Sequence, residues 1–185
     1  MSQIILASAS PRRKDLLEQI GLEFEICPAK GEEIITESRP DAVVLELSRQ
    51  KAEEVATGVL TYNEQHPDLA TPQDILVIGA GDGGVVRELT RYDRVRHIDL
   101  VEMDPMVVEA CRAYLPGNAC RLDDRRVHLH YENALKFIRR CENKYDLIIV
   151  DSSDPFGPSE GLFTREFYGN CYNALKEDGI MVNQQ

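Results

Sequence analysis

A chain of 185 residues is long enough for one ordinary domain or two small ones with a real hydrophobic core. Its composition, 43% hydrophobic and 29% charged, excludes a disordered, collagen-like or fibrous protein. The formal net charge of -11, from 32 acidic and 21 basic residues, disfavours a role that depends on binding nucleic acid or an anionic membrane.

The five cysteines lie far apart and form no CxxC pair. This spacing predicts reduced thiols in a cytoplasmic protein, and it argues against a disulfide framework or a zinc site. The first residues lack the order of basic and apolar residues that a secretory signal requires, and no apolar run approaches the roughly 18 residues of a membrane helix. We therefore expect a cytoplasmic protein whose partners are neither nucleic acid nor membrane.

The beginning of the chain alternates strand and helix signals. Ser10 and Pro11 combine an N-cap residue with proline at the first helical position, and Gly21 is a natural helix end. Apolar residues recur along one side of a later segment and predict a second helix. We expect strands at 3–7 and 22–27, a helix from Pro11 to Gly21, and a helix at 41–56.

Residues 57–73 contain two prolines and no convincing periodicity, which is typical of a junction. After them the alternation becomes regular. We expect strands at 74–79, 96–102, 126–131, 145–151 and 179–183, with helices at 83–92, 104–114, 132–142 and 164–176. Repeated β-α units predict an α/β fold, with a mostly parallel sheet covered by helices on both faces.

A glycine-rich loop, Gly79-Ala80-Gly81-Asp82-Gly83-Gly84, follows the strand at 74–79. Glycines there permit a tight turn and a close approach of the backbone to a ligand at the helix N-terminus. Glu102 ends the next strand, where its carboxylate can accept hydrogen bonds from both hydroxyls of a ribose. Loop, strand and acid together indicate a nucleoside site, whereas the loop alone would be an ordinary turn.

Asp82 lies inside this loop and would repel a pyrophosphate group. It favours a cationic ligand instead, such as a sulfonium nucleoside that carries an ammonium group. A purely structural role is the alternative, because aspartate is also a common helix N-cap.

Two carboxylates follow the strand at 145–151, in the run Asp151-Ser-Ser-Asp154-Pro-Phe-Gly-Pro. The carboxyl ends of parallel strands are where open α/β sheets bind ligands, and the prolines stiffen this loop. Asp151 and Asp154 can therefore attract a diamine and remove a proton from the attacking amine. The alternative is that both residues only cap turns.

Together these motifs resemble the spermidine synthase family of aminopropyltransferases over about residues 74–184. The matching runs are ILVIGAGDGGVVREL, DLVEMDPMVVEACRAYLP, DDRRVHLHYENALKFIRR, YDLIIVDSSDPFGPSEGLFTREFY and ALKEDGIMVNQ. The resemblance implies a Rossmann-like, methyltransferase-like core that transfers an aminopropyl group from decarboxylated S-adenosylmethionine to putrescine. That nucleoside would be a co-substrate, with no tightly bound cofactor and no metal.

The resemblance also implies a role for each motif residue. Asp151 would be the amine-activating base, Asp154 would hold the diamine, and Asp82 would contact the aminopropyl ammonium. Glu102 would bind the ribose, beside Gly79, Gly81 and Gly83 of the loop.

The chain departs from this family in two respects. Asn133 stands where the family usually has an acidic residue against the adenine, and we expect its side-chain oxygen to accept a hydrogen bond from the adenine amino group. We also expect the chain to lack the family's N-terminal β-rich domain and its closing antiparallel strands, because family members are much longer. A pocket without those walls would be expected to turn over weakly or not at all.

The first third of the chain resembles the start of a second family, the Maf family of nucleoside triphosphate pyrophosphatases. The matching runs are IILASASPRRKDLLEQIGLEFEI and ELSRQKAEEVA. Backbone amides at a helix N-terminus beside arginines can cradle a triphosphate, and the alternative is a solvated first turn. The resemblance implies phosphate-site residues at Ser8, Ser10, Arg12, Arg13, Glu33 and Lys51.

The chain therefore looks like a chimera of the two families. We expect a Maf-like partial α/β segment at 1–56, a junction at 57–73 and a truncated aminopropyltransferase core at 74–185. Three functions stay open: an aminopropyltransferase acting on a sulfonium nucleoside and a diamine, a Maf-like pyrophosphatase, and a non-catalytic nucleoside-binding protein. Whether the chain forms a homodimer stays open too.

Overall fold

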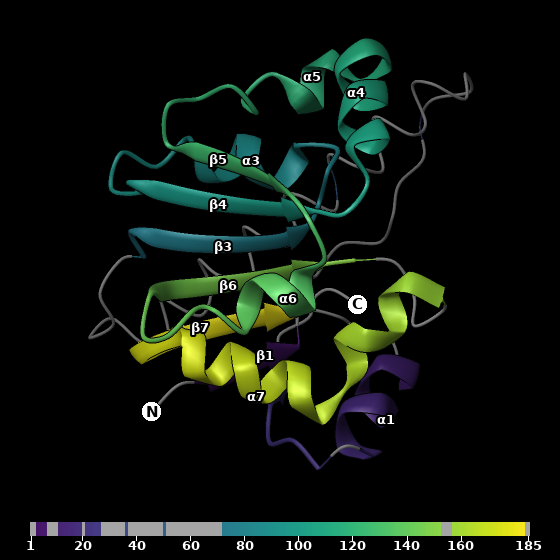
Figure 1. Cartoon of the computed structure of the whole chain (residues 1–185), viewed down its shortest axis with the longest axis vertical. Coiled ribbons are helices and arrows are strands. Elements are labelled where there is room, and N and C mark those ends of the chain that lie inside the picture. The colour runs from purple at the N-terminus through teal and green to yellow at the C-terminus, as the bar shows by residue number, and fades with distance from the viewer. Residues whose placement is uncertain are drawn as a thin grey trace.

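The computed structural model of the chain describes residues 3–6, 11–19, 21–26, 36, 50, 72–152 and 157–183. These residues form one seven-stranded sheet in the order β2-β1-β7-β6-β3-β4-β5, in which every pair of neighbouring strands is parallel (Figure 1). The strands are β1 (Gln3–Leu6), β2 (Glu25–Ile26), β3 (Asp74–Gly79), β4 (His97–Glu102), β5 (Val127–Tyr131), β6 (Tyr145–Asp151) and β7 (Leu175–Asn183). The helices are α1 (Pro11–Gln19), α3 (Gly84–Leu89), α4 (Pro105–Tyr114), α5 (Pro116–Ala119), α6 (Ala134–Ile138) and α7 (Arg165–Ala174), with a 3-10 segment η1 (Gly157–Phe163).

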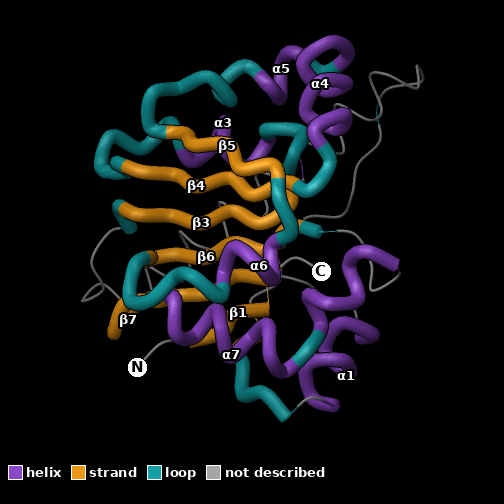
Figure 2. The backbone as a smooth tube through the Cα atoms, in the orientation of Figure 1, coloured by secondary structure: helices purple, strands orange, loops and turns teal. Residues whose placement is uncertain are grey.

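Helices cover both faces of the sheet, as the sequence predicts. Alternate residues of the central strands point to opposite faces, so their continuous apolar runs are buried on both sides. On one face, strand residues such as Val77 pack with α3, α4 and α5; on the other, residues such as Ile78 pack with α1, α6 and α7. Figure 2 shows α6 and α7 crossing in front of the strands and α3 behind them.

The beginning of the chain joins this sheet. β1 pairs in parallel with β7, with Gln3 opposite Ile180 and Leu6 opposite Asn183, and β2 pairs with β1 at the edge. Leu6 of β1 and Leu17 of α1 are buried in the same apolar cluster as the inner side chains of α7. The strand predicted at 3–7 is thus a sheet strand, and the helix starts at Pro11 as predicted.

Several predicted boundaries are wrong. The strand expected at 22–27 spans only Glu25–Ile26 within the described residues, and the helices expected at 83–92 and 132–142 are shorter, at Gly84–Leu89 and Ala134–Ile138. The short helix α5 was not expected. Some predictions fall outside the described residues. These are Ser10, residue 27, nearly all of the helix expected at 41–56 and most of the junction at 57–73.

The last strand starts earlier than the sequence predicts, at Leu175 rather than Gly179. Leu175 pairs with Tyr145, but the next pair is Ile180 with Leu147, so the intervening residues of β7 bulge out of register. The apolar spacing of α7 continues into this bulge, which explains why a helix to residue 176 was expected. Within the described residues, no helix is long and apolar enough to span a membrane.

Candidate functional site

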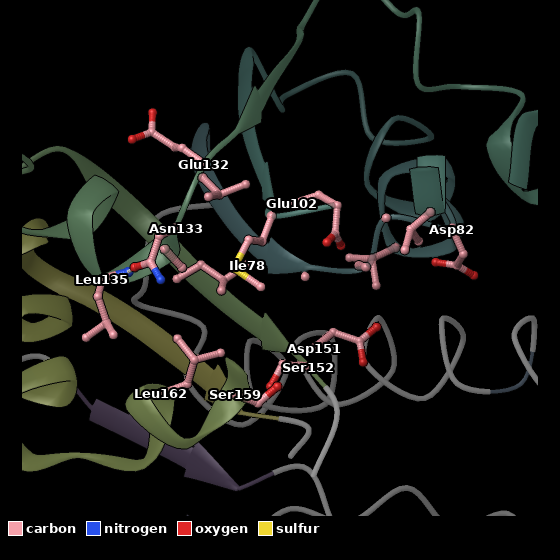
Figure 3. A pocket seen from close by; sticks show the side chains of 18 of the residues that line it. Ile78, Asp82, Glu102, Glu132, Asn133, Leu135, Asp151, Ser152, Ser159 and Leu162 are labelled. Carbon is pink, nitrogen blue, oxygen red and sulfur yellow. Dashed lines mark hydrogen bonds between the residues drawn. The ribbon is translucent and has the colours of Figure 1, made fainter. Parts of the chain in front are cut away.

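A cavity of about 530 Å³ opens at the carboxyl ends of β3, β4, β5 and β6 (Figure 3). Its size is typical of a site for a small molecule. Polar side chains line it at the strand ends, and apolar side chains from α4, α6 and η1 complete its walls. It is lined by Ile78, Gly79, Ala80, Gly81, Asp82, Gly84, Val85, Val101, Glu102, Met103, Val107, Glu132, Asn133, Ala134, Leu135, Asp151, Ser152, Ser159 and Leu162.

The glycine loop forms the part of this cavity that follows β3. Gly79 has a φ of 78°, and a Cβ atom there would lie 2.0 Å from the backbone oxygen of Asp151. The next residue, Ala80, donates its N–H to that same oxygen at 3.0 Å. Only glycine therefore allows the loop to pass so close to the end of β6.

Glu102 enters the cavity from the end of β4. Its Oε1 accepts a hydrogen bond from the N–H of Asp104 at 3.0 Å, and Asp104 in turn caps α4. A Cβ atom on Gly81 would lie only 2.7 Å from Glu102 Oε2. The missing side chain at Gly81 thus leaves room for the Glu102 carboxylate beside the loop.

Asp82 is half-buried and is held through both of its oxygens. Oδ1 accepts from the N–H of Gly84 at 3.2 Å, and Oδ2 accepts from Nδ2 of Asn118 at 2.9 Å. The N-cap of α3 is Gly83, so Asp82 supports the first turn from one residue earlier. Within the described part of the chain, neither Asp82 nor Glu102 has a lysine, arginine or histidine as an ion-pair partner.

The charge of these two carboxylates reaches a neighbouring thiol on α4. Burial raises the pKa of Cys111, and the charges of Asp82 and Glu102 raise that pKa further. The cavity is therefore a region of negative potential, which a cationic ligand would relieve.

Asn133 lies at the end of β5 and is the N-cap of α6. Its Oδ1 accepts hydrogen bonds from the N–H groups of Leu135 at 2.9 Å and Lys136 at 3.3 Å. This oxygen is the atom that we expected to meet the adenine amino group. Since the helix cap engages it, Nδ2 is the amide atom left for a ligand, and among the described residues nothing accepts a hydrogen bond from it.

Asp151 and Ser152 enter the cavity from the end of β6 (Figure 3). The carboxylates of Asp82, Glu102 and Asp151 surround one side of the cavity, while Asn133 and Leu135 lie on the other. Asp154, the second carboxylate of the predicted pair, lies outside the described residues.

The predicted phosphate-site residues are only partly described. Arg12 and Arg13 lie in the first turn of α1, which follows β1. Ser8, Ser10, Glu33 and Lys51 lie outside the described residues. No group of three or more histidine, cysteine, aspartate or glutamate side chains in the described ranges is arranged to hold a metal ion.

Sequence reasoning missed Asn118 and the residues of η1. Asn118 lies far from Asp82 in sequence, in the short helix α5, which no motif marks, so only the fold reveals their contact. Ser159 and Leu162 line the cavity because η1 packs against α6, which local patterns do not predict.

Comparison with known proteins identifies relatives for both parts of the chain. Residues 53–185 match the model of the spermine/spermidine synthase domain, and residues 3–92 match that of Maf-like proteins. The polyamine aminopropyltransferases of Alkaliphilus oremlandii and Clostridium perfringens (strain SM101) are 67% and 70% identical to this chain over 112 residues, or 60% of its length. The chain spans only 39% and 40% of the length of those two relatives.

Solved structures agree with this result. A spermidine synthase in complex with the transition-state analogue AdoDATO is 45% identical, with a TM-score of 0.58, over 60% of this chain and 38% of that one. The spermidine synthase of Thermotoga maritima is 43% identical, with a TM-score of 0.57, over 61% of this chain and 38% of that one. From residue 53 onward, the chain thus belongs to the spermine/spermidine synthase family, and it begins with a segment similar to Maf-like proteins.

Proposed function

We propose that the cavity binds decarboxylated S-adenosylmethionine and a diamine, and that the chain carries the core of an aminopropyltransferase. The observation that carries this proposal is the pair of cavity carboxylates, Asp82 and Glu102, without a cationic partner among the described residues. A ligand with a sulfonium and an ammonium group would supply the missing positive charge. Relatives named polyamine aminopropyltransferase support the same choice of ligand.

The order of groups along the strand ends matches such a nucleoside. Glu102 would accept hydrogen bonds from the ribose hydroxyls, and Asp82 would pair with the aminopropyl ammonium beside the glycine loop. The base would lie toward Asn133, between the apolar side chains of Met103 and Leu135. No tightly bound cofactor or metal is required, because the nucleoside is consumed as a co-substrate.

In the proposed reaction Asp151 would accept a proton from the amine of putrescine. The nitrogen lone pair then forms a bond to the carbon next to the sulfonium, and the carbon–sulfur bond breaks with its electron pair moving to sulfur. The products would be spermidine and neutral methylthioadenosine. Orientation of the two reactants and deprotonation of the amine would supply most of the rate acceleration. Asp154 would hold the far end of the diamine.

A Maf-like pyrophosphatase is the second candidate, favoured by the family match at residues 3–92 and by Arg12 and Arg13 in the first turn of α1. A nucleoside-binding protein without turnover is the third. For each candidate we infer small-molecule partners and a cytoplasmic location. A chimeric origin of the chain would account for its two family matches.

The test is to mix the full chain with decarboxylated S-adenosylmethionine and putrescine and to measure methylthioadenosine by mass spectrometry. Asp151→Asn should lower its release by about a hundredfold or more while leaving the affinity for methylthioadenosine unchanged. Asp123→Asn is the control, since the exposed Asp123 side chain pairs with Arg112 and neither residue lines the cavity.

Three results would overturn parts of the proposal. If the nucleoside raises the melting temperature but no product forms, the chain is a binding protein. Pyrophosphate release from nucleoside triphosphates with a divalent metal would support the pyrophosphatase. Equal loss of binding and release in Asp151→Asn would contradict the role of Asp151 as a base.

A further inference from the structure

A buried amide outside the cavity contacts one of its carboxylates. Asn118 of α5 is fully buried, and its Nδ2 donates to Asp82 Oδ2 at 2.9 Å. On its other side, Asn118 Oδ1 accepts from Nη1 of Arg87 at 2.8 Å. An arginine can only donate hydrogen bonds, so Arg87 fixes which atom of the amide faces Asp82.

The arginine in this chain of contacts is paired elsewhere. Arg87 Nε donates to Glu88 Oε1 at 2.8 Å, and Arg91 donates to the other oxygen of Glu88 at 2.7 Å. Burial would raise the pKa of Glu88, but the hydrogen bonds and charges of Arg91 and Arg87 outweigh it and lower the pKa. The positive charge of Arg87 is thus largely compensated by an ionised glutamate on its own helix.

The amide therefore separates an arginine from Asp82. A direct contact between Arg87 and Asp82 would neutralise the carboxylate, whereas the neutral Asn118 orients it and leaves its charge to a ligand. The close packing of α5 on the loop makes this contact available. Gly83 has a φ of 83°, and a Cβ atom there would lie 3.0 Å from the backbone oxygen of Asn118.

We propose that Asn118 is a positioning residue, which holds the Asp82 carboxylate toward the cavity for the cationic arm of the nucleoside. Among the described residues, no cationic side chain compensates the charge of this carboxylate. This inference rests on the proposed function of the cavity, because it requires a cationic ligand. It assigns to α5 and α3 a part in ligand choice, although Asn118 itself does not line the cavity.

The test compares two nucleosides, decarboxylated S-adenosylmethionine and 5′-methylthioadenosine, which lacks the cationic arm. Their dissociation constants are measured by calorimetry for the full chain and its variants. Asn118→Leu should reduce the preference for the cationic nucleoside by about tenfold, since a hydrogen bond to a charged group is lost, and leave the affinity for methylthioadenosine within about twofold. Asp82→Asn gives the reference for complete loss of the preference.

A second pair of variants tests the contact between Asn118 and Asp82 without changing Asn118 itself. Arg87→Met frees Asn118 to rotate and should remove part of the preference, even if Asn118→Leu does not fold. Arg91→Met is the matched control, because Arg91 also pairs with Glu88 but does not touch Asn118. The preference of Arg91→Met for the cationic nucleoside over methylthioadenosine should equal that of the unchanged chain.

The outcomes separate this inference from the function on which it rests. If the unchanged chain does not distinguish the two nucleosides, the proposed function fails. If it does, and Asp82→Asn loses the preference while a folded Asn118→Leu or Arg87→Met keeps it in full, only the positioning role is overturned. An equal loss of affinity for both nucleosides in these variants would also overturn it, since that result indicates a merely structural role.

Discussion

At the scale of single residues, the site depends on which polar atoms the local structure engages and which it leaves to a ligand. Asp82 and Glu102 each accept backbone hydrogen bonds but have no cationic partner in the described ranges. The side-chain oxygen of Asn133 caps α6, so its amide nitrogen is the atom left for a ligand. A residue type read from the sequence says which atoms a side chain has, whereas the backbone around it decides which of them can bind.

The orientation of Asn133 predicts a choice of base. Its Nδ2 is a donor, so it suits an acceptor on the base, such as the keto oxygen of hypoxanthine, better than the amino group of adenine. Asn133→Asp keeps an oxygen for the helix cap and replaces the donor with an acceptor. We expect this variant to shift the ratio of affinities for methylthioadenosine over methylthioinosine by about tenfold toward adenosine.

Calorimetric titration of both nucleosides measures this ratio. The melting temperature should not change, because aspartate caps helices as well as asparagine does. A ratio that is unchanged, or that moves toward inosine, would show that Nδ2 does not face the exocyclic group of the base.

At the scale of elements, the strands that carry continuous apolar runs are predictable from the sequence. The predicted bounds of β3 and β6 are correct residue for residue. Both are central strands, and their apolar runs are sharply bounded: ILVI lies between Asp74 and Gly79, and LIIV lies between Asp146 and Asp151. The start of β7 and the segment η1 were not predicted. Their conformations depend on pairing with Tyr145 and on packing against Leu135, which are tertiary contacts.

A buried carboxylate, Asp99, links the strands β4, β5 and β6 beneath α6. Asp99 of β4 accepts hydrogen bonds from His130 of β5 at 2.7 Å, from Lys144 at 2.8 Å and from the Tyr145 hydroxyl of β6 at 2.8 Å, and His97 Nε2 lies 3.0 Å away. Burial would raise the pKa of Asp99, but these donors outweigh it and lower the pKa well below its ordinary value. The ionised form thus stabilises the fold.

This lowered pKa predicts an acid-sensitive fold. The stabilisation is fully present above the ordinary aspartate pKa, roughly 4, and is lost as the pH falls below it. We expect Asp99→Asn to reduce the free energy of unfolding by about 3 kcal/mol at pH 7, because charged donors lose their partner, and by less at pH 3. Urea unfolding at both pH values checks this; an equal reduction at both would contradict it.

At the scale of the whole molecule, segments similar to two families share one sheet. β1, from the Maf-like part, pairs with β7 of the spermidine synthase-like part, and Leu6 is buried where they meet. The sequence predicted a strand at residues 3–7 but not its partner, since a parallel strand pairing over this separation leaves no local signal. The overlap of the two family matches, at residues 53–92, includes β3.

This shared sheet predicts one unfolding transition. Leu6→Ala should lower the free energy of unfolding by about 2 to 5 kcal/mol, the usual cost of truncating a buried leucine. The urea midpoint measured at the cavity end of the sheet should fall by the same amount as the midpoint measured for the whole chain. Urea unfolding followed by far-UV circular dichroism and by displacement of bound methylthioadenosine measures both. Tyr114→Ala is the control, because that side chain is 82% exposed on α4. Two separate transitions would show that β1 folds apart from the core.

The central claim is that the ends of β3, β4 and β5 form a nucleoside site. A crystal structure of the full chain with methylthioadenosine tests it most directly. We expect both ribose hydroxyls within hydrogen-bonding distance of the Glu102 carboxylate, the base against Asn133 and the thioether near Asp82. A nucleoside bound at the start of α1, or one in the cavity with its ribose away from Glu102, would contradict the claim.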